Sequence, residues 1–166
     1  CGVVYGEDEH IFLPAKPRIE VLKEIIDEAG TKAIVFVPFK GVLKYVAEEL
    51  AQDYTVGTIS GETPKTERDK TFHDFQQTGD PRVLVAQPAA MSHGLTLTAA
   101  STVVWFAPVT SNEVYEQANA RVTRPGQKHT QFIVNIEGSE VERRIYARLR
   151  DKQKMQGLLL EMVRSC

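Results

Sequence analysis

Five short runs of apolar or β-branched residues recur along the chain, separated by segments with a different hydrophobic period. They occupy residues 33–38, 54–59, 82–87, 101–108 and 131–136. The run AIVFVP at 33–38 has no polar alternation, which is typical of a strand buried on both faces of a parallel sheet. Strands that alternate with helices at short spacings predict a three-layer α/β domain with a mainly parallel central sheet flanked by helices.

Apolar side chains at three- and four-residue intervals predict the helices of the first half of the chain. One helix follows Pro17 and ends at Gly30, because glycine readily adopts the left-handed conformation that closes a helix. A second occupies residues 40–52. We expect a third to be capped by Thr63, with Pro64 at its first helical position.

The second half of the chain predicts two more helices. Thr110 and Glu113 have the spacing of a capping box, which predicts a helix over residues 112–122. A long, charge-rich amphipathic segment, residues 139–163, predicts a final helix that is interrupted near Gly157. The loop between the third and fourth strands shows neither a helical nor a strand period.

The composition is that of a globular protein, and the length of 166 residues fits one domain over 1–166, with a lead-in strand or hairpin in residues 1–15. The net charge of −2 means that any surface for nucleic acid must be a local cluster of basic residues. The two cysteines, Cys1 and Cys166, form no disulfide framework, which favours a reducing compartment.

Two further expectations concern the cellular setting. A chain that opens at Cys1 without an initiator methionine suggests a piece of a longer protein. No apolar run approaches membrane-spanning length, so we expect no membrane partner. The expected location is the cytoplasm of a bacterium or phage-infected cell, or the nucleus if the source is eukaryotic.

The loops that follow the first three strands of the predicted sheet carry polar and small residues. Phe39 and Lys40 follow the first strand, 60–63 follows the second, and 87–94 follows the third. Ligands of parallel sheets bind outside the carboxyl ends of the strands, where these loops converge. The sequence therefore predicts a functional edge there.

A second candidate site lies between Glu116 and Lys128. If residues 112–122 are helical, Gln117 and Arg121 are neighbours one turn apart, and Arg124 lies just beyond on the same side. Arginine stays protonated and its planar fork suits phosphate oxygens, so the pair predicts a phosphate clamp. The alternative is structural, because cations at a helix C-terminus also interact favourably with the helix macrodipole.

The sequence contains no loop that would hold that phosphate. It has no G-x-x-x-x-G-K-[ST] motif, no G-x-G-x-x-G and no G-x-S-x-G, and its four histidines do not lie at metal-binding spacings. Arginines suited to phosphate, without a phosphate loop, imply that another domain supplies the loop.

Five segments in order carry recognisable patterns: AIVFVPFKGVLKYVAEEL, ISGETPKTERDKTFHDFQ, VLVAQPAAMSHGLTLTAASTVVWFAP, YEQANARVTRPGQ and SEVERRIYARLRDKQKMQGLLLEMV. In content and order they resemble motif IV, the Gly-x-Thr turn with its helix, motif V, motif VI and the long helix after motif VI of the second RecA-like lobe of superfamily 2 helicases. The resemblance is closest to the SWI/SNF-type DNA-dependent ATPases. The motif VI pattern Q-x-x-x-R-x-x-R-x-G-Q is met in full.

Two positions depart from the family's pattern. Thr96 stands where the family usually has asparagine, and Met91, Ser92 and His93 replace a more glycine-rich run. The second departure resembles variants in phage-encoded helicase-like proteins, which favours a viral or bacterial source.

The resemblance implies a RecA-like domain, the fold of P-loop NTPases, without a P-loop of its own. ATP and Mg²⁺ would be held mainly by an N-terminal RecA-like lobe of the same protein that this chain does not contain. Arg124 would be the arginine finger, with Arg121 beside it. The expected nucleotide contacts are Gly94, Leu95, Gln117 and Gln127.

The resemblance also implies that DNA, duplex or forked and bound without sequence preference, crosses the loops at the carboxyl edge. The candidate contacts are Phe39, Lys40, Ser60, Gly61, Thr63, Lys65, Ser92 and His93. The implied function is the second motor lobe of an ATP-dependent DNA helicase or translocase, inactive in isolation. Two alternatives stay open: a lobe of an RNA-unwinding branch, and a nucleic-acid or protein binding module that keeps the fold without catalysis.

Overall fold

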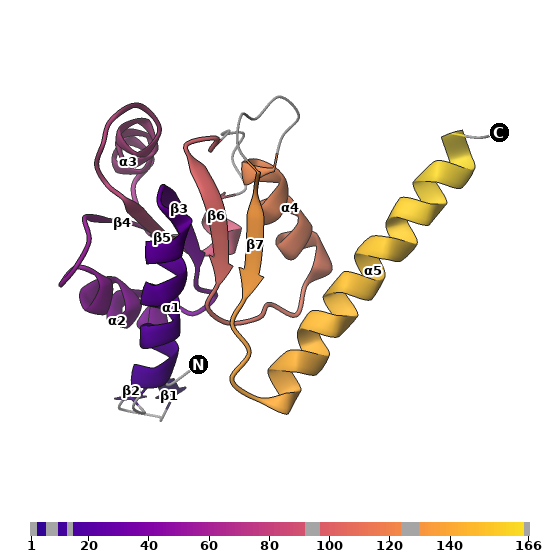
Figure 1. Cartoon of the computed structure of the whole chain (residues 1–166), viewed down its shortest axis with the longest axis horizontal. Helices are drawn as coiled ribbons and strands as arrows, with labels where there is room; N and C mark the ends of the chain where they lie inside the picture. Colours follow the sequence, from indigo (N-terminus) through magenta and orange to yellow (C-terminus); the bar gives the residue numbers. More distant parts are fainter. Residues whose placement is uncertain (1–2, 6–9, 13–14, 92–96, 124–129, 165–166) are drawn as a thin grey trace.

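A five-stranded parallel sheet forms the centre of the protein, which is described by a computed structural model over residues 3–5, 10–12, 15–91, 97–123 and 130–164 (Figure 1). Its strands are β3 (Lys32–Phe36), β4 (Val56–Ile59), β5 (Val83–Ala86), β6 (Ala100–Trp105) and β7 (Phe132–Asn135). The spatial order is β4-β5-β3-β6-β7, and every neighbouring pair in this sheet is parallel. The predicted α/β class and all five predicted strands are confirmed.

Helices cover both faces of the sheet. The helices are α1 (Lys16–Ala29), α2 (Lys40–Leu50), α3 (Lys65–Gln77), α4 (Asn112–Val122) and α5 (Glu140–Arg164), with a short 3₁₀ helix, η1 (Pro88–Met91), after β5. Buried side chains of α1 and α2 share one core, and those of α3, α4 and α5 share the other. The three predicted layers are therefore present.

The central strand β3 shows why the predicted runs carry no polar alternation. Ile34 and Phe36 enter the core beneath α3 and α4, whereas Ala33 and Val35 enter the core beneath α1 and α2. Successive side chains of a strand point to opposite faces, and both faces of β3 are covered. All four of these side chains are fully buried.

Two N-terminal strands form a separate sheet. β1 (Val3–Tyr5) pairs with β2 (His10–Phe12) in antiparallel register, from Val3 opposite Phe12 to Tyr5 opposite His10. The chain then enters α1, which ends at Gly30 with a φ of 62°, the left-handed closure that the sequence predicts. The extent of the domain over 1–166 stays a prediction.

The N-caps of two helices each lie one residue after the expected cap. Pro64 is the N-cap of α3, and the Thr63 hydroxyl instead accepts a hydrogen bond from the Ser60 N–H at 2.9 Å, closing the preceding turn. Ser111, not Thr110, caps α4 and accepts from the Val114 N–H at 3.4 Å. At α4, Thr110 and Ser111 are neighbouring hydroxyl residues that could each cap the helix, and spacing alone does not decide between them. At α3, Pro64 caps the helix without a side-chain hydrogen bond.

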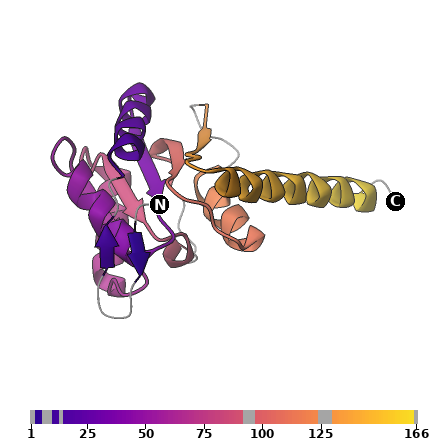
Figure 2. The same cartoon turned by 90° about the horizontal axis from the view of Figure 1, so that it is seen from below.

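The final helix α5 runs through Gly157 without the interruption that we expected. An interior glycine costs a helix only about 1 kcal/mol relative to alanine, which a helix of this length tolerates. The first turns of α5 pack on the domain, where the buried Tyr146 hydroxyl donates to the Trp105 carbonyl at 3.2 Å. Figure 2 shows the rest of the helix extending away from the domain.

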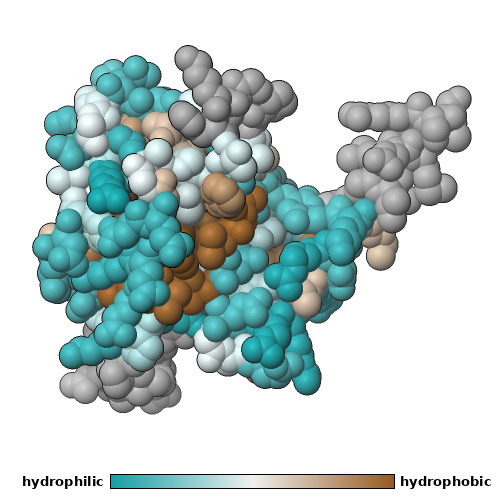
Figure 3. Space-filling view, viewed as in Figure 1, coloured by the Kyte–Doolittle hydropathy of each residue, from teal (hydrophilic) through white to brown (hydrophobic). Residues whose placement is uncertain are grey.

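The edge strand β7 leaves apolar side chains in solvent. Figure 3 shows hydrophobic side chains on the surface of the face viewed in Figure 1. Phe132 and Ile133 of β7 are 58% and 41% exposed. Their exposure contrasts with the strands β3, β5 and β6, most of whose side chains are buried in the two cores.

A largely buried ion pair anchors the start of α5. Arg18 of α1 donates to the Phe106 carbonyl and to the Glu142 carboxylate, and the Gly138 N–H donates to the same carboxylate at 2.7 Å. The Arg18 and Glu142 side chains are 11% and 13% exposed. Burial alone would raise the pKa of Glu142, but the hydrogen bonds from Arg18 and Gly138 and the Arg18 charge outweigh it, so the pKa lies below its usual value.

We expect Glu142→Gln to lower the free energy of unfolding at pH 7 by about 2 kcal/mol, because it leaves Arg18 without its anionic partner. A carboxyl whose pKa is lower in the folded state stabilises the protein above the unfolded pKa of about 4.3, and this contribution is lost as the pH falls through the folded pKa. The variant should therefore lose less stability than the wild type on acidification, measured by urea unfolding between pH 7 and pH 3.

Glu140→Gln is the matched control on the same helix. Glu140 pairs with Arg143 and Arg144, but its side chain is 59% exposed, so its loss should cost less than about 1 kcal/mol. Equal destabilisation by the two variants would show that the Arg18–Glu142 anchor contributes no more than a surface pair.

Candidate functional site

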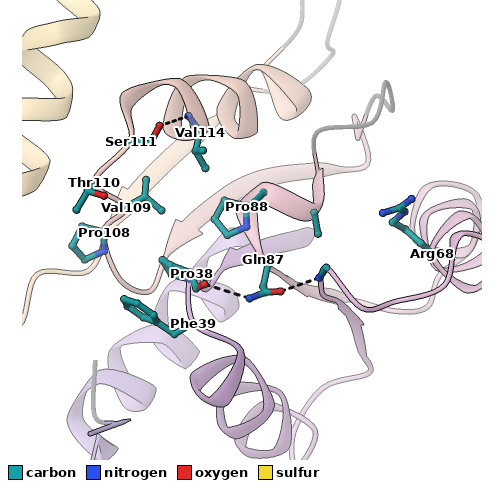
Figure 4. Close-up of a pocket in the computed structure, with 13 residues that line it drawn as sticks. Pro38, Phe39, Arg68, Gln87, Pro88, Pro108, Val109, Thr110, Ser111 and Val114 are labelled. Atoms are coloured by element: carbon teal, nitrogen blue, oxygen red, sulfur yellow. Dashed lines mark hydrogen bonds between the residues drawn. The ribbon is translucent and has the colours of Figure 1, made fainter. Parts of the chain in front are cut away.

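A cleft of about 590 Å³ opens at the carboxyl edge of the sheet (Figure 4). The loops after β3, β4, β5 and β6 contribute its lining, which includes Pro38 and Phe39, Gly61, Gln87 and Pro108. The parallel topology brings these loops together, because all of the strands end at the same edge. The predicted functional edge is thus a concave surface that contains Phe39 and Gly61.

Gln87 holds two of these loops in place. Its side-chain oxygen accepts from the Gly61 N–H at 2.9 Å, and its side-chain nitrogen donates to the Pro38 carbonyl at 3.4 Å (Figure 4). The Gln87 N–H also donates to the Ile59 carbonyl at 2.9 Å. One side chain therefore fixes the loop after β3 relative to the loop after β4. The sequence analysis included Gln87 in one of the loops of the predicted functional edge but assigned it no role.

The turn at 60–63 satisfies its own backbone donors. The Ser60 N–H donates to the Thr63 hydroxyl, the Thr63 N–H to the Ser60 carbonyl at 3.1 Å, and the Glu62 N–H to the Ser60 hydroxyl at 3.3 Å. The Gly61 N–H is bonded to Gln87. The turn itself has no spare N–H with which to bind phosphate, so the side chains nearby must supply the charge.

The cations around the cleft differ in their partners. Lys40 pairs with Glu62 at 2.5 Å. Lys65 and Arg68 lie three residues apart on the first turn of α3, which places them on one helix face, and neither makes an ion pair with any described residue. Arg68 also lines the cleft. Arg68 belongs to the Gly-x-Thr segment but was not among the site residues predicted from the sequence, and only the structure places its side chain at the cleft.

The second candidate cluster lies on α4, whose bounds Asn112–Val122 match the predicted helix. The Gln117 amide donates to the Glu113 carboxylate at 3.0 Å, and Arg121 is partly exposed. The Arg121 carbonyl accepts from the Leu97 N–H at 3.0 Å, just before the start of β6. Arg121 therefore lies near the amino ends of the strands, at the opposite end of the sheet from the cleft.

Six predicted site residues fall outside the described part of the chain. They are Ser92, His93, Gly94, Leu95, Arg124 and Gln127. Of the described candidates, Phe39 and Gly61 line the cleft, and Lys40, Ser60, Thr63 and Lys65 lie beside them in the same loops and helix starts at the carboxyl edge. Gln117 lines a small hollow with Pro88 and Ala89, which also line the cleft, whereas Arg121 lies toward the opposite end of the sheet.

A buried hydrogen bond fixes α4 on the sheet. The Trp105 indole N–H donates to the Asn119 side-chain oxygen at 2.9 Å, and both side chains are almost fully buried. Trp105 also contacts Phe36 and Tyr115, with ring centroids 4.8 and 4.7 Å apart. The bond sets the rotation of α4 and so the direction in which Gln117 and Arg121 project. The sequence analysis did not identify Asn119, although a polar residue among the apolar positions of the predicted helix could have indicated a buried hydrogen bond.

Asn119→Ala should lower the free energy of unfolding by about 2 kcal/mol, because the buried Trp105 N–H loses its acceptor. Thermal or urea unfolding measures the effect. Gln117→Ala is the control, since it removes an exposed amide two residues away on the same helix. A loss no larger than that of the control would mean that the Trp105–Asn119 bond does not hold α4.

Neither a three-ligand metal site nor a membrane-spanning helix is found in the described ranges. No three His, Cys, Asp or Glu side chains there lie close enough to hold a metal ion. No described helix combines the length and apolar character needed to cross a bilayer.

The model of one protein family, the helicase conserved C-terminal domain, matches residues 17–126. The matched stretch includes the cleft loops and α4, and it covers more than half of the chain. The chain belongs to this family. The matched residues also contain the motif VI pattern up to Gly126.

Curated relatives of this helicase C-terminal domain include SWI/SNF-type proteins. A SWI/SNF-related regulator of chromatin, subfamily A-like protein 1, of Xenopus tropicalis is 33% identical over 66% of this chain and 12% of its own length. The DNA excision repair protein ERCC-6-like of Bos taurus is 35% identical over 78% of this chain and 11% of its own. The chromatin-remodeling ATPase INO80 of Emericella nidulans is 27% identical over 93% of this chain and 10% of its own.

The chain thus spans about a tenth of the length of these relatives. A solved structure, the C-terminal part of the Fun30 ATPase domain, superposes on 78% of this chain and 44% of its own with a TM-score of 0.71 at 24% identity. This likeness supports the RecA-like fold. The resemblance to SWI/SNF-type helicases is confirmed by the relatives.

Proposed function

We propose that this helicase C-terminal domain is the second motor lobe of an ATP-dependent DNA helicase or translocase. One observation carries the proposal: the sheet presents at its carboxyl edge an exposed aromatic ring and cations that have no ion-pair partner among the described residues, and the C-terminal end of the motif VI helix lies at its opposite end. The two ends suit the two ligands of a motor, a nucleic acid and a nucleotide. The chain has the side chains for part of each site.

The residues at the α4 end fit the outer side of a nucleotide site. Arg121 and Gln117 supply a permanent cation and an amide donor, groups suited to phosphate oxygens. The described residues contain no acidic cluster for a metal, and the sequence has no P-loop, so a first lobe would hold ATP and Mg²⁺. ATP would supply the phosphoryl group whose charge grows during transfer. Gly94, Leu95 and Gln127 would contribute further nucleotide contacts.

Arg124 would be the arginine finger, beside Arg121. A guanidinium presented across the cleft between two lobes stabilises negative charge that develops on the phosphoryl oxygens, an effect worth about 10³ to 10⁵ in rate. The Asn119–Trp105 bond supports this role by fixing the helix that leads to Arg124. Gln117 would orient the arginine or the nucleotide once its contact with Glu113 is exchanged.

DNA would run along the carboxyl edge. Lys65 and Arg68 have no ion-pair partner among the residues that the structure describes and would contact phosphates, and Lys40 would do so on leaving Glu62. Such contacts carry no sequence information, so binding should be non-specific and sensitive to salt. Ser92 and His93 would extend the same surface.

In the protein with its first lobe, we expect Arg124→Ala to lower DNA-stimulated ATP hydrolysis at least 10³-fold while ATP affinity changes little, because the finger acts on the transition state. ATPase assays and nucleotide-binding titrations measure the two effects. Arg148→Ala, an exposed arginine of α5, is the control. The 166-residue chain alone should show no hydrolysis, and turnover by the pure chain would contradict the two-lobe proposal.

Lys65→Ala should weaken DNA binding about equally for all sequences and reduce the slope of log affinity against log salt by about 1, because one phosphate contact is lost. Anisotropy titrations over a series of salt concentrations measure the slope. Lys44→Ala is the control, a lysine of α2 whose side chain is 80% exposed and pairs with Glu48. An unchanged slope in the Lys65 variant would show that Lys65 does not contact DNA phosphates. Tighter binding of RNA than of DNA by the wild type would favour the RNA-unwinding branch.

A further inference from the structure

The cleft at the carboxyl edge is lined mainly by apolar side chains, which contacts with phosphate do not require. Its lining includes the rings of Pro38, Pro88 and Pro108, together with Phe39 and Val109. Phosphates would need only donors and cations at a convex edge. An apolar hollow of about 590 Å³ beside those cations calls for a ligand with an apolar, flat part.

The hollow is held open by its own bonding. Each proline ring fixes the φ angle of its residue. The Gln87 side-chain oxygen accepts from the Gly61 N–H, and its side-chain nitrogen donates to the Pro38 carbonyl. A ligand would therefore meet a preformed apolar surface whose amide is already engaged. Such a surface recognises a shape and a π-face and reads no hydrogen-bond pattern.

Charge distinguishes the possible occupants. Among the described residues that line the cleft, Arg68 is the charged one and none is acidic, and Arg68 has no ion-pair partner in the described part of the chain. In Figure 4 Arg68 lies on one side of the cleft and Thr110 on the other. A neutral peptide side chain would fill the hollow and leave Arg68 unpaired, whereas a nucleotide unit brings a planar base and a phosphate together.

We propose that the cleft receives one unstacked base of the bound DNA strand, which lies against Phe39 and the proline rings while the adjacent phosphate meets Arg68. This inference rests on the proposed function, because it names how the same DNA edge grips its substrate. Phe39 is 43% exposed at the rim, where it can stack. Stacking on an aromatic side chain is tolerant of base identity, in keeping with non-specific binding.

The proposal selects among DNA structures. A base within an intact duplex is stacked and paired, so it is not available to the cleft without a cost in unstacking. Single-stranded or forked DNA offers the base directly. The cleft would therefore give this lobe a preference for DNA that is already opened.

The test measures anisotropy of a labelled single strand and of a duplex with wild-type chain and with Phe39→Ala, Phe39→Trp and Phe132→Ala. Phe39→Ala should weaken single-strand binding about 10-fold and duplex binding less than 2-fold, because stacking on one base is lost. Phe39→Trp should restore single-strand binding. Phe132→Ala removes a phenylalanine on β7 that is more exposed than Phe39 and lies away from the cleft, and it should change neither affinity.

A second experiment measures binding of a series of single strands, each of which carries one abasic site at a different position of the bound segment. At one position the abasic site should weaken wild-type binding about 10-fold and have no further effect in Phe39→Ala. If Phe39→Ala weakens single strand and duplex equally, or if no abasic position matters, the base pocket is refuted while DNA binding stands. If Phe39→Ala spares DNA binding but weakens association with the first lobe, the cleft is a protein-docking surface. If wild-type chain and the two-lobed protein bind no DNA, the proposed function itself fails.

Discussion

Burial of β3 on both faces is the constraint on which the rest of the structure depends. β3 pairs with β5 on one side and β6 on the other, and its side chains alternate between two separate cores. A strand in that position needs helices above and below it, and each crossover must return the chain to the same end of the sheet. The loops that leave the carboxyl ends are thereby collected at one edge, and the cleft forms where they meet.

The same crossovers separate the two candidate sites. α4 leaves the cleft edge near Ser111 and carries the chain back toward the opposite end, so Arg121 lies about two helical turns, roughly 10 Å, from Val114, which lines the cleft. A change at one site can reach the other through a rigid element instead of through direct contact. The Trp105–Asn119 bond and the aromatic contacts of Trp105 tie that element to the central strands, which makes α4 a mechanical link between the proposed DNA and nucleotide ends.

Hydrophobic period and strand length predicted the layers, the five strands and the helix at 112–122, because burial on two faces leaves a direct record in the sequence. The exact cap residues were predicted wrongly, because the N-caps of α3 and α4 are Pro64 and Ser111, each one residue after the expected Thr63 and Thr110. The cleft edge was predicted from the topology of parallel sheets. Its apolar character was not, because Pro38, Pro88 and Pro108 are distant in sequence and each reads alone as an ordinary loop residue.

The exposed edge of β7 bears on how this chain behaves outside a larger assembly. An edge strand offers unpaired backbone groups to any neighbouring strand, and Phe132 and Ile133 add apolar surface to that offer. Natural sheets usually blunt such edges with charge or proline, and the FIVN sequence of β7 has neither. Concentrated preparations of the chain would be prone to self-association along this edge, whereas any polypeptide that covered β7 would also act as its solubilising partner.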